Sequence, residues 1–346
     1  MSTEECGVSG VTAPNTVATE PSTPEQVLEA GLTAHFKRPV RIAEMDADSF
    51  WAEAIDRQID RLRVTLESGE VLQMIFKRFN PEPGLEHDSH EALKDYKREV
   101  LVYRRLLCDP NFGAPALYAS AYDPTREQYW LFMEDLGEST LDHKSLKHFL
   151  ATAGWLGRMH GAYAGRQEEL RRLGCLVEHD QQFYRALGSI AHRNFQVAGE
   201  KEDLERFEGL RPRFESAAGD LLRQPRTLLH GDFAPHNVIL EPGGRIRPLD
   251  WEWAAVGPVG WDLAGLYYEW QSDQADFLAA YAREFQRHSA ISLDDGDIER
   301  AYSLCEVVYK LWILAMNPER FPHPGYVGRL LDKMEHAWDR LQVVNG

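Results

Sequence analysis

The segment from Leu228 to Leu266 constrains the fold of this chain most, because it places polar residues at both ends of a predicted β-hairpin. It reads LLHGDFAPHNVILEPGGRIRPLDWEWAAVGPVGWDLAGL. The apolar run Val238-Ile239-Leu240 is followed by the turn signal Pro242-Gly243-Gly244 and by a second short strand pattern that ends before Asp250. We therefore expect a loop, a strand, a turn, a strand, a loop and a helix, in this order.

The polar residues around this hairpin fit the chemistry of phosphoryl transfer. That reaction needs a positioned acceptor hydroxyl and neutralisation of phosphate charge rather than covalent help from the protein. Asp232 can orient a hydroxyl and accept its proton, while Asn237 and Asp250 offer the oxygen ligands that Mg²⁺ prefers. Judged by its residues alone, the segment could also be a polar hairpin followed by an N-capped helix.

The pattern His230-Gly231-Asp232, four further residues and Asn237, with Asp250 eighteen residues after Asp232, resembles a known pair of loops. It is similar to the catalytic and metal-binding loops of the aminoglycoside phosphotransferase and choline kinase-like superfamily, relatives of the protein kinases. The stretch from Asp250 to Ala264 also resembles many bacterial members. The resemblance implies an α+β, two-lobed protein-kinase-like fold, with a small antiparallel β N-lobe and a larger, mainly helical C-lobe. It implies ATP and Mg²⁺ as cofactors.

Composition indicates how the chain is organised. Residues 1–24 are rich in Ser, Thr, Pro, Gly and Glu, and we expect a disordered tail there. We place an N-lobe with the nucleotide-binding sheet and hinge at 25–136, and a helical C-lobe with the catalytic and metal-binding loops at 137–346. No secretory signal pattern and no run of eighteen apolar residues is found, so we expect a cytoplasmic protein that does not bind to a membrane.

Charge and cysteine content limit the partners. The 346 residues include 38 basic and 55 acidic residues, a formal charge of -17, which argues against a nucleic acid partner and is compatible with a cationic substrate. The four cysteines lack C-x-x-C spacing, so we expect reduced thiols and no zinc site; they are Cys6, Cys108, Cys175 and Cys305. The sequence carries no signal for oligomeric state.

The N-terminal half shows the pattern of a small sheet with two helices. We expect a helix at Pro24–Phe36 with Thr23 as N-cap, and a second, amphipathic helix at Asp95–Leu107. Strand patterns occur at Val40–Ile42, Arg61–Leu66 and Val71–Phe79. In the resemblance, Lys77 falls where the family keeps a phosphate-binding lysine on its third strand, and Glu99 falls where a helix carboxylate holds that lysine. The alternatives are a solvated lysine at a strand end and an exposed helix pair.

Two further nucleotide contacts are expected from the resemblance. No glycine lies between Gly31 and Gly69, so a Gly-rich phosphate lid is absent, and the connection near residues 46–50 is the expected replacement. Ser49 could donate to a phosphate there, although the carboxylates of Asp46 and Asp48 would repel one. The backbone around Glu134 and Leu136 would form the hinge that bonds the adenine.

The C-terminal half is predicted to be helical. Leu146–Tyr163 has the period of a buried helix, and we expect its His160 to be a hydrogen-bonded core histidine rather than a catalytic one. Residues 167–222 form a helical insertion, of the kind that shapes the acceptor site in the superfamily. Further helices are expected at 276–285, 297–316 and 326–344. His230 should fix the catalytic loop through a backbone bond, and Asp262 should cap a helix beginning at Leu263 and bond back to that loop.

The short spacing after Asp250 indicates a small acceptor. Only residues 251–261 separate Asp250 from Asp262, too few for the segment with which a protein kinase docks a polypeptide. Candidate acceptor contacts, if the substrate carries amines, are Glu252, Trp253, Glu269, Trp270 and Glu306. Packing aromatics and solvated surface charges are the alternative interpretation of these residues.

These observations predict an ATP- and Mg²⁺-dependent O-phosphotransferase that acts on a hydroxyl of a small molecule. An antibiotic such as an aminoglycoside, another natural product or an amino sugar is the first expectation, which would make the protein a resistance enzyme. A kinase for choline, ethanolamine or homoserine is an alternative. A nucleotide-binding pseudokinase or regulatory module is another, kept open by the glycine-free lid.

Overall fold

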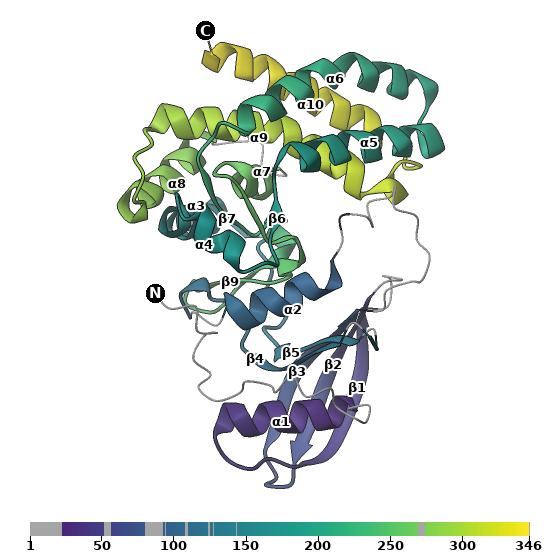
Figure 1. The fold of residues 1–346 in the computed structure, drawn as a ribbon, viewed down its shortest axis with the longest axis vertical. Coiled ribbons are helices and arrows are strands. Elements are labelled where there is room, and N and C mark those ends of the chain that lie inside the picture. Colours follow the sequence, from purple (N-terminus) through teal and green to yellow (C-terminus); the bar gives the residue numbers. More distant parts are fainter. Residues whose placement is uncertain are drawn as a thin grey trace. The chain divides into compact units, whose positions relative to one another are not determined.

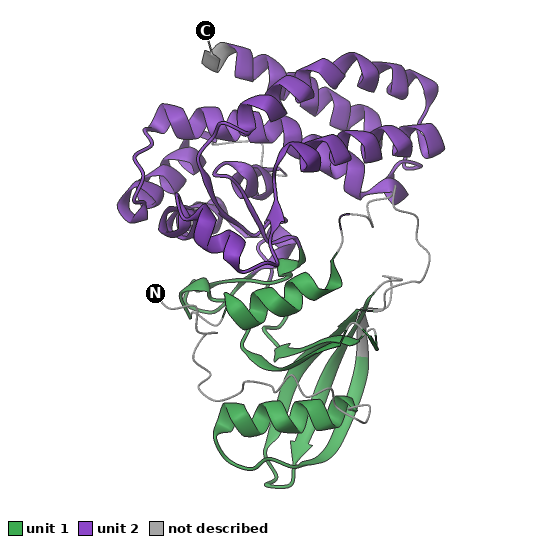
Figure 2. Cartoon of the chain, viewed as in Figure 1, with its two compact units in different colours: residues 1–85, 95–139, 239–252 green, residues 86–94, 140–238, 253–346 purple. Residues whose placement is uncertain are grey.

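The computed structural model describes residues 23–51, 57–79, 93, 95–107, 110–123, 125–126, 128–142, 144–268 and 274–345. The described residues divide into two compact units (Figure 2). The first contains those within 1–85, 95–139 and 239–252, and the second those within 86–94, 140–238 and 253–346. The expected tail, apart from its last two residues, lies outside the described residues, as do Cys6, Cys108, Glu269 and Trp270.

The first unit is built on a five-stranded antiparallel sheet with the order β1-β2-β3-β5-β4 (Figure 1). Two helices accompany it, α1 (Pro24–Phe36) and α2 (Tyr96–Arg105). The strands are β1 (Ile42–Trp51), β2 (Arg57–Leu66), β3 (Val71–Phe79), β4 (Leu117–Asp123) and β5 (Gln128–Glu134). The predicted helix at Pro24–Phe36 and the strand at Val71–Phe79 are confirmed, and Thr23 caps α1 in a reciprocal capping box with Gln26.

The two faces of this sheet carry different residues because consecutive side chains of a strand point to opposite sides. Phe76 of β3 belongs to an apolar core that includes Leu28 and Leu32 of α1. The next residue, Lys77, contacts Glu99 of α2. Helix α1 therefore closes the hydrophobic side of the sheet, and α2 receives the charged side.

The first strand differs from the prediction. It begins at Ile42 rather than Val40 and continues through residues 46–50, which were expected to form a connection. In the antiparallel register, Asp46 faces Arg63 and Asp48 faces Arg61 on β2. Opposite charges on facing positions favour strand pairing, so an acidic segment that resembles a loop is held as an edge strand.

The second unit is mainly helical. Its long helices are α3 (Leu146–Tyr163), α5 (Gln181–Ala198), α6 (Lys201–Leu221), α8 (Gln274–His288), α9 (Asp295–Met316) and α10 (Tyr326–Asn345). Short helices α4 (Gln167–Arg172) and α7 (Trp261–Tyr267) accompany a three-stranded sheet of β6 (Val177–Glu178), β10 (Ala255–Pro258) and β7 (Arg226–Leu229). The predicted helix at Leu146–Tyr163 and the helical character of 167–222 are confirmed.

Helix α9 runs through the core of this unit, and most of its residues from Ile298 to Ala315 are buried. Helix α3 packs closely on α8, because Gly157 leaves room for the backbone of Tyr281. A Cβ atom at Gly157 would overlap the backbone carbonyl oxygen of Tyr281. Cys175 and Cys305, the described cysteines of this unit, are buried and are not joined by a disulfide bond.

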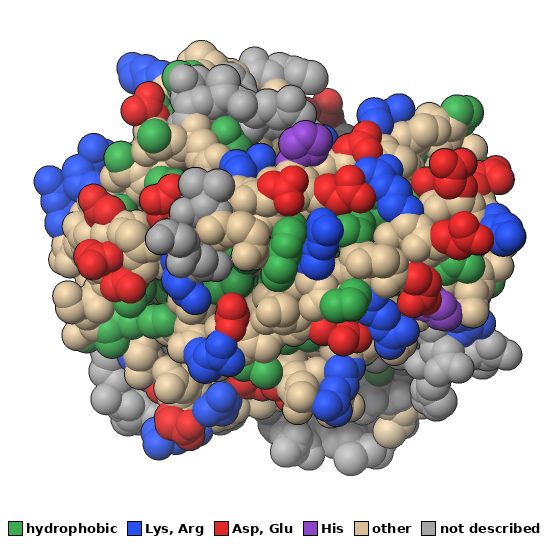
Figure 3. Space-filling model, turned by 90° about the horizontal axis from the view of Figure 1, so that it is seen from above, with side chains coloured by type: hydrophobic (Ala, Val, Ile, Leu, Met, Phe, Trp, Pro, Cys, Tyr) green, Lys and Arg blue, Asp and Glu red, His purple; other side chains and the backbone are tan. Residues whose placement is uncertain are grey.

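The predicted hairpin is present as β8 (Val238–Leu240) paired with β9 (Ile246–Pro248). In the part of the chain that the structure describes, no helix combines the length and apolar character needed to cross a membrane. On the face shown in Figure 3, acidic and basic side chains of the described residues are interspersed rather than gathered by sign.

Candidate active site

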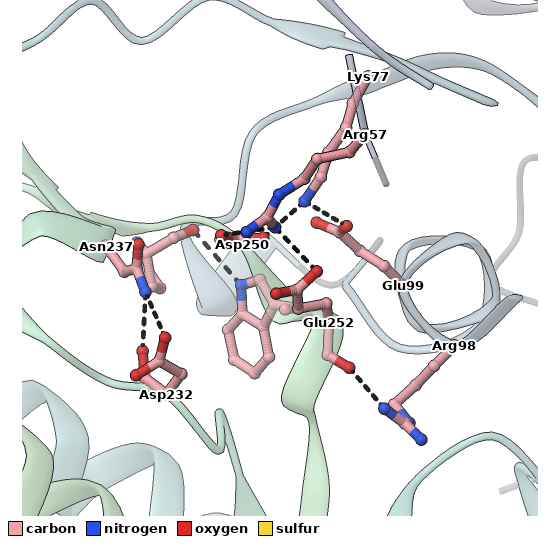
Figure 4. Close-up of polar contacts among 10 residues, drawn as sticks. Arg57, Lys77, Arg98, Glu99, Asp232, Asn237, Asp250 and Glu252 are labelled. Atoms are coloured by element: carbon pink, nitrogen blue, oxygen red, sulfur yellow. Dashed lines mark hydrogen bonds and ion pairs between the residues drawn. The ribbon is translucent and has the colours of Figure 1, made fainter. Parts of the chain in front are cut away.

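Lys77 lies at the centre of a cluster of charged residues in the first unit (Figure 4). Its ammonium nitrogen lies 2.6 Å from Oε2 of Glu99 and 2.5 Å from Oδ1 of Asp250. Lys77 is only 3% exposed and Glu99 only 1%. A buried ammonium group needs such partners. Lys77 of β3 thus contacts both α2, through Glu99, and the segment after β9, through Asp250.

The electrostatics of the pair follow from its burial. Burial by itself lowers the pKa of Lys77, but the attraction of Asp250 and Glu99 outweighs this effect and leaves the pKa raised. Burial raises the pKa of the Glu99 carboxyl, and Lys77 opposes that shift. Lys77 is therefore positively charged at neutral pH.

Asp250 adopts an unusual backbone conformation. Its φ is 66°, and among the described non-glycine residues only Lys37 shares a positive φ. Such a conformation costs energy in an L-residue and is enriched at functional sites. Here it directs the carboxylate to Lys77, while Oδ2 lies 3.7 Å from Nη1 of Arg57.

Glu252 completes the cluster. Its Oε2 atom lies 2.9 Å from Nη1 of Arg57, and its backbone carbonyl accepts a 2.8 Å hydrogen bond from Arg98. Among the described residues, carboxylate oxygens of Glu99, Asp250 and Glu252 lie within 4.8 Å of one another, and a hard divalent cation prefers oxygen donors of this kind.

In the second unit, Asp232 lies in the loop between β7 and β8. Its side chain is partly exposed. Asn237 donates from Nδ2 to the backbone carbonyl (3.0 Å) and to Oδ2 (3.2 Å) of Asp232. Tyr309 of α9 is within 3.5 Å of the other carboxylate oxygen, Oδ1. Because the Asn237 amide nitrogen faces Asp232, its oxygen is directed elsewhere and can serve as a ligand.

Asp262 supports this loop from α7. Its carboxylate accepts hydrogen bonds from the backbone amides of His230 (2.6 Å) and Gly231 (2.9 Å). The predicted bond back to the loop is therefore present. The prediction that Asp262 caps a helix beginning at Leu263 is wrong, because α7 begins at Trp261 with Gly260 at the N-cap. The fully buried carboxylate instead satisfies two buried amides.

His160 lies on the other side of Asp262. Its Nε2 is 3.1 Å from the Asp262 carboxylate, and its Nδ1 is 2.7 Å from the hydroxyl of Tyr281 and 3.2 Å from the carbonyl oxygen of Val259. The prediction of a hydrogen-bonded core histidine is confirmed, since both ring nitrogens have partners and the residue is fully buried.

Gly231 could not be replaced without cost. Its φ is 91°, and a Cβ atom would overlap the carbonyl oxygen of Trp253. The carbonyl of Gly231 accepts a 3.0 Å hydrogen bond from the indole of Trp261. The glycine of the His230-Gly231-Asp232 motif thus lets the loop pass against the backbone of Trp253.

The segment predicted to form the hinge begins at the end of β5. The carboxylate of Glu134 accepts hydrogen bonds from Ala116 (3.0 Å) and Arg247 (2.5 Å), so its side chain is used within the first unit. Leu136 follows β5 and is half-buried. Ser49 lies on β1 opposite Asp60, in a strand rather than in the expected connection.

The candidate acceptor residues lie in different surroundings. Trp253 is 8% exposed and meets Trp312 edge to face, which fits the packing alternative. Glu252 is paired with Arg57. Glu306 is not a solvated charge, because it is paired with Lys310 (3.0 Å) and Arg340 (2.6 Å).

Sequence reasoning missed Arg57, Tyr309 and Arg247. The contacts of Arg57 and Tyr309 depend on strand register and helix packing, which no short motif reveals. Arg247, only 4% exposed, binds Gly113, Ala114, Glu134 and Glu241. Its position between two apolar strand residues, Ile246 and Pro248, gave no signal of burial, because the alternation of side chains along a strand predicts a solvent-facing arginine there.

Comparison with known proteins identifies the family. The model of the phosphotransferase enzyme family matches residues 51–299, well over half of the chain. The chain belongs to the phosphotransferase enzyme family. Homoserine kinase from Zymomonas mobilis subsp. mobilis is 30% identical over 155 residues, which cover 42% of this chain and 45% of that relative. The match thus spans less than half of the homoserine kinase.

Solved structures of similar fold extend over nearly all of the chain. A choline kinase from Streptococcus pneumoniae matches with a TM-score of 0.51 at 14% identity, covering 92% of this chain and 99% of that one. An aminoglycoside phosphotransferase solved with streptomycin and ATP matches with a TM-score of 0.53 at 15% identity, covering 91% and 99%. At these identities the likeness shows the fold, and the expected two-lobed, kinase-like α+β fold is confirmed. The prediction of a small-molecule kinase is confirmed at the level of the family.

Proposed function

We propose that this phosphotransferase moves the γ-phosphoryl group of ATP to a hydroxyl of a small molecule, with Mg²⁺ as cofactor. The observation that carries the proposal is the buried Lys77, held by Glu99 and Asp250. An ammonium group fixed between two carboxylates is suited to contact the nucleotide phosphates, because its direction is set before the nucleotide arrives.

The donor atoms fit a magnesium ion. Asp250 and Glu252 offer carboxylate oxygens from the segment after β9, and Asn237 has an amide oxygen that is not directed at Asp232. When bound, Mg²⁺ would neutralise charge on the phosphates. In the proposal Asp250 and Asn237 hold the ion, and Lys77 contacts the phosphates.

Asp232 is the proposed catalytic residue. Asn237 and Tyr309 contact its two carboxylate oxygens, so the carboxylate has a fixed direction and remains partly exposed. We propose that it orients the acceptor hydroxyl and takes its proton late in the transfer. In the same proposal, backbone groups near Glu134 and Leu136 bond the adenine, and Ser49 contributes to the phosphate contacts.

We propose that the acceptor is a small molecule, because the short spacing between Asp250 and Asp262 leaves no long segment for docking a polypeptide. An antibiotic, another natural product or an amino sugar is our first proposal, with Glu252, Trp253, Glu269 and Trp270 as acceptor contacts. The partial match to a homoserine kinase favours homoserine as a second candidate.

The experiment is to measure ADP release from Mg²⁺-ATP across aminoglycosides, other hydroxyl-bearing antibiotics, amino sugars, choline, ethanolamine and homoserine. We expect one class to stimulate turnover strongly, and Asp232→Asn to lower kcat by about a thousandfold or more with nearly unchanged ATP affinity. Near-normal turnover of Asp232→Asn would remove Asp232 from its role. Tight binding of Mg²⁺-ATP without turnover on any acceptor would favour the pseudokinase alternative.

A further inference from the structure

Arg57 occupies a position in the charged cluster that the roles proposed above do not explain. The cluster contains the carboxylates of Glu99, Asp250 and Glu252 and the cations of Lys77 and Arg57. Lys77 binds Glu99 and Asp250, whereas Arg57 binds Glu252 at 2.9 Å and approaches Asp250 at 3.7 Å (Figure 4). The two cations thus share one carboxylate, and Arg57 has Glu252 as its own partner.

The strand register explains why these cations lie together. Arg57 is the first residue of β2 and faces Phe79 of β3, while Ile59 faces Lys77. Residues two apart on a strand share a face, so Arg57 and Lys77 are diagonal neighbours on the same side of the sheet. Both therefore reach the same carboxylates, although they come from different strands.

The two cations differ in how firmly they are held. The side chain of Lys77 is 4% exposed, whereas those of Arg57, Asp250 and Glu252 are 26%, 24% and 20% exposed. A partly exposed ion pair is screened by water and is weaker than a buried one. Arg57 can therefore leave its carboxylates at a much lower cost than Lys77 can.

We propose that Arg57 is an exchangeable counter-ion, which competes with the divalent cation for Glu252 and Asp250. A metal ion and a guanidinium cannot both take the same lone pairs of the Glu252 carboxylate at full strength. Phosphate groups offer Arg57 an alternative bidentate partner close to Lys77. Arg57 thereby couples the two ligands, because a bound nucleotide draws the guanidinium away from the carboxylates that bind the metal. The inference rests on the metal role of Asp250 in the proposed function and extends that role to Glu252, whose carboxylate lies within 4.8 Å of that of Asp250.

Binding of Mn²⁺ by the full chain tests this without any turnover. Mn²⁺ would be titrated by electron paramagnetic resonance, in the absence of nucleotide and in the presence of ADP. Without nucleotide, Arg57→Gln should bind Mn²⁺ about tenfold more tightly than the wild type, because the competing charge-assisted hydrogen bond is gone. The increase in Mn²⁺ affinity on adding ADP should be smaller in Arg57→Gln than in the wild type.

Three comparisons keep the test specific. Arg78→Gln is the matched control, because it removes an arginine of similar exposure from the same sheet, whose partner Asp60 lies outside the carboxylate group; its Mn²⁺ affinity should equal that of the wild type. In a Glu252→Gln background, Arg57→Gln should change Mn²⁺ affinity less than it does in the wild type, since the Glu252 carboxylate that Arg57 binds at 2.9 Å is gone. If Arg57→Gln does not fold, Arg57→Lys serves, with an expected intermediate affinity.

The outcomes separate this inference from the proposed function. Equal Mn²⁺ affinity in the wild type and Arg57→Gln, with clear binding in both, would overturn the role of Arg57 and leave the metal assignment standing. No Mn²⁺ binding by the wild type, with or without ADP, would overturn the proposed metal role and this inference with it.

Discussion

The carboxylate of Asp262 lies 2.6 Å from the backbone nitrogen of His230, and it also accepts from Gly231 and contacts His160. All of these groups are buried. Asp262→Ala would leave two buried amides and a ring nitrogen without an acceptor, so we expect a loss of about 3 to 5 kcal/mol of unfolding free energy. The loop carrying Asp232 should move as a result, and kcat should fall.

Urea unfolding and steady-state kinetics would measure these two effects. Asp262→Asn keeps one oxygen acceptor, so its losses of unfolding free energy and of kcat should both be smaller. A fully stable and active Asp262→Ala variant would contradict the role of this carboxylate.

Lys77→Met should destabilise the first unit and weaken nucleotide binding. The substitution leaves the buried Glu99 carboxylate without its cation, at a cost of about 3 kcal/mol. We expect the dissociation constant for ATP, measured by calorimetry, to rise at least about tenfold through the lost phosphate contact.

The double variant Lys77→Met/Glu99→Gln separates these two effects. Removing both charges should restore much of the stability, because no buried charge is then left unpaired. ATP binding should remain weak. Recovery of ATP binding in the double variant would show that Lys77 acts through Glu99 alone and not on the nucleotide.

Gly231→Ala should abolish turnover, and Gly243→Ala is its matched control. Both glycines have φ above 90°, but a Cβ atom at Gly243 meets nothing within 4 Å. Gly243→Ala should therefore cost only about 1 kcal/mol from backbone strain. Gly231→Ala should cost more than about 3 kcal/mol, because the new methyl group collides with the backbone of Trp253. Similar melting temperatures for the two variants would contradict this explanation.

Lys310 should give the protein an unusual dependence of stability on pH. Burial lowers its pKa from the ordinary value of 10.5 to about 8, because Glu306 offsets only part of the cost of a buried charge. Between these pKa values the unfolded chain keeps the proton that the folded chain has lost, so unfolding free energy rises with pH. This contribution is fully present above pH 10.5 and is lost as the pH falls through 8.

Comparison with Lys310→Met isolates that contribution. As the pH rises from 8 to 10.5, the wild type should gain on the order of 3 kcal/mol relative to the variant. Urea titrations at several pH values would measure the difference. Parallel curves for the two proteins would show that Lys310 titrates normally.

The sequence predicted those parts of the fold that local patterns determine. The N-cap Thr23 and the apolar period of Leu146–Tyr163 are local signals, and both helices occur at the predicted bounds. The strand at Ile42–Trp51 was misjudged because its acidic residues are stabilised by facing arginines on β2. That stabilisation depends on which residues of β2 face the acidic residues of β1. The sequence of one strand alone does not reveal this pairing.

The same distinction holds for the candidate site. Lys77 and Glu99 were expected from motif resemblance, and the structure brings them to 2.6 Å. Asp262 was correctly expected to bond the loop, but it was wrongly expected to cap the helix. Its carboxylate is used by the buried backbone amides of His230 and Gly231 instead. Arg57 was missed because its partner Glu252 lies 195 residues away.

The order in which the first unit's segments occur along the chain bears on how the protein is made. Its last segment, 239–252, leaves the ribosome only after residues 140–238 of the second unit. That segment brings Arg247, which binds Gly113 and Glu134, and Asp250, which binds Lys77. A nascent chain that stops short of this segment has a sheet whose buried lysine lacks one of its two carboxylates. The charged cluster around Lys77 is therefore completed only after much of the second unit has been synthesised.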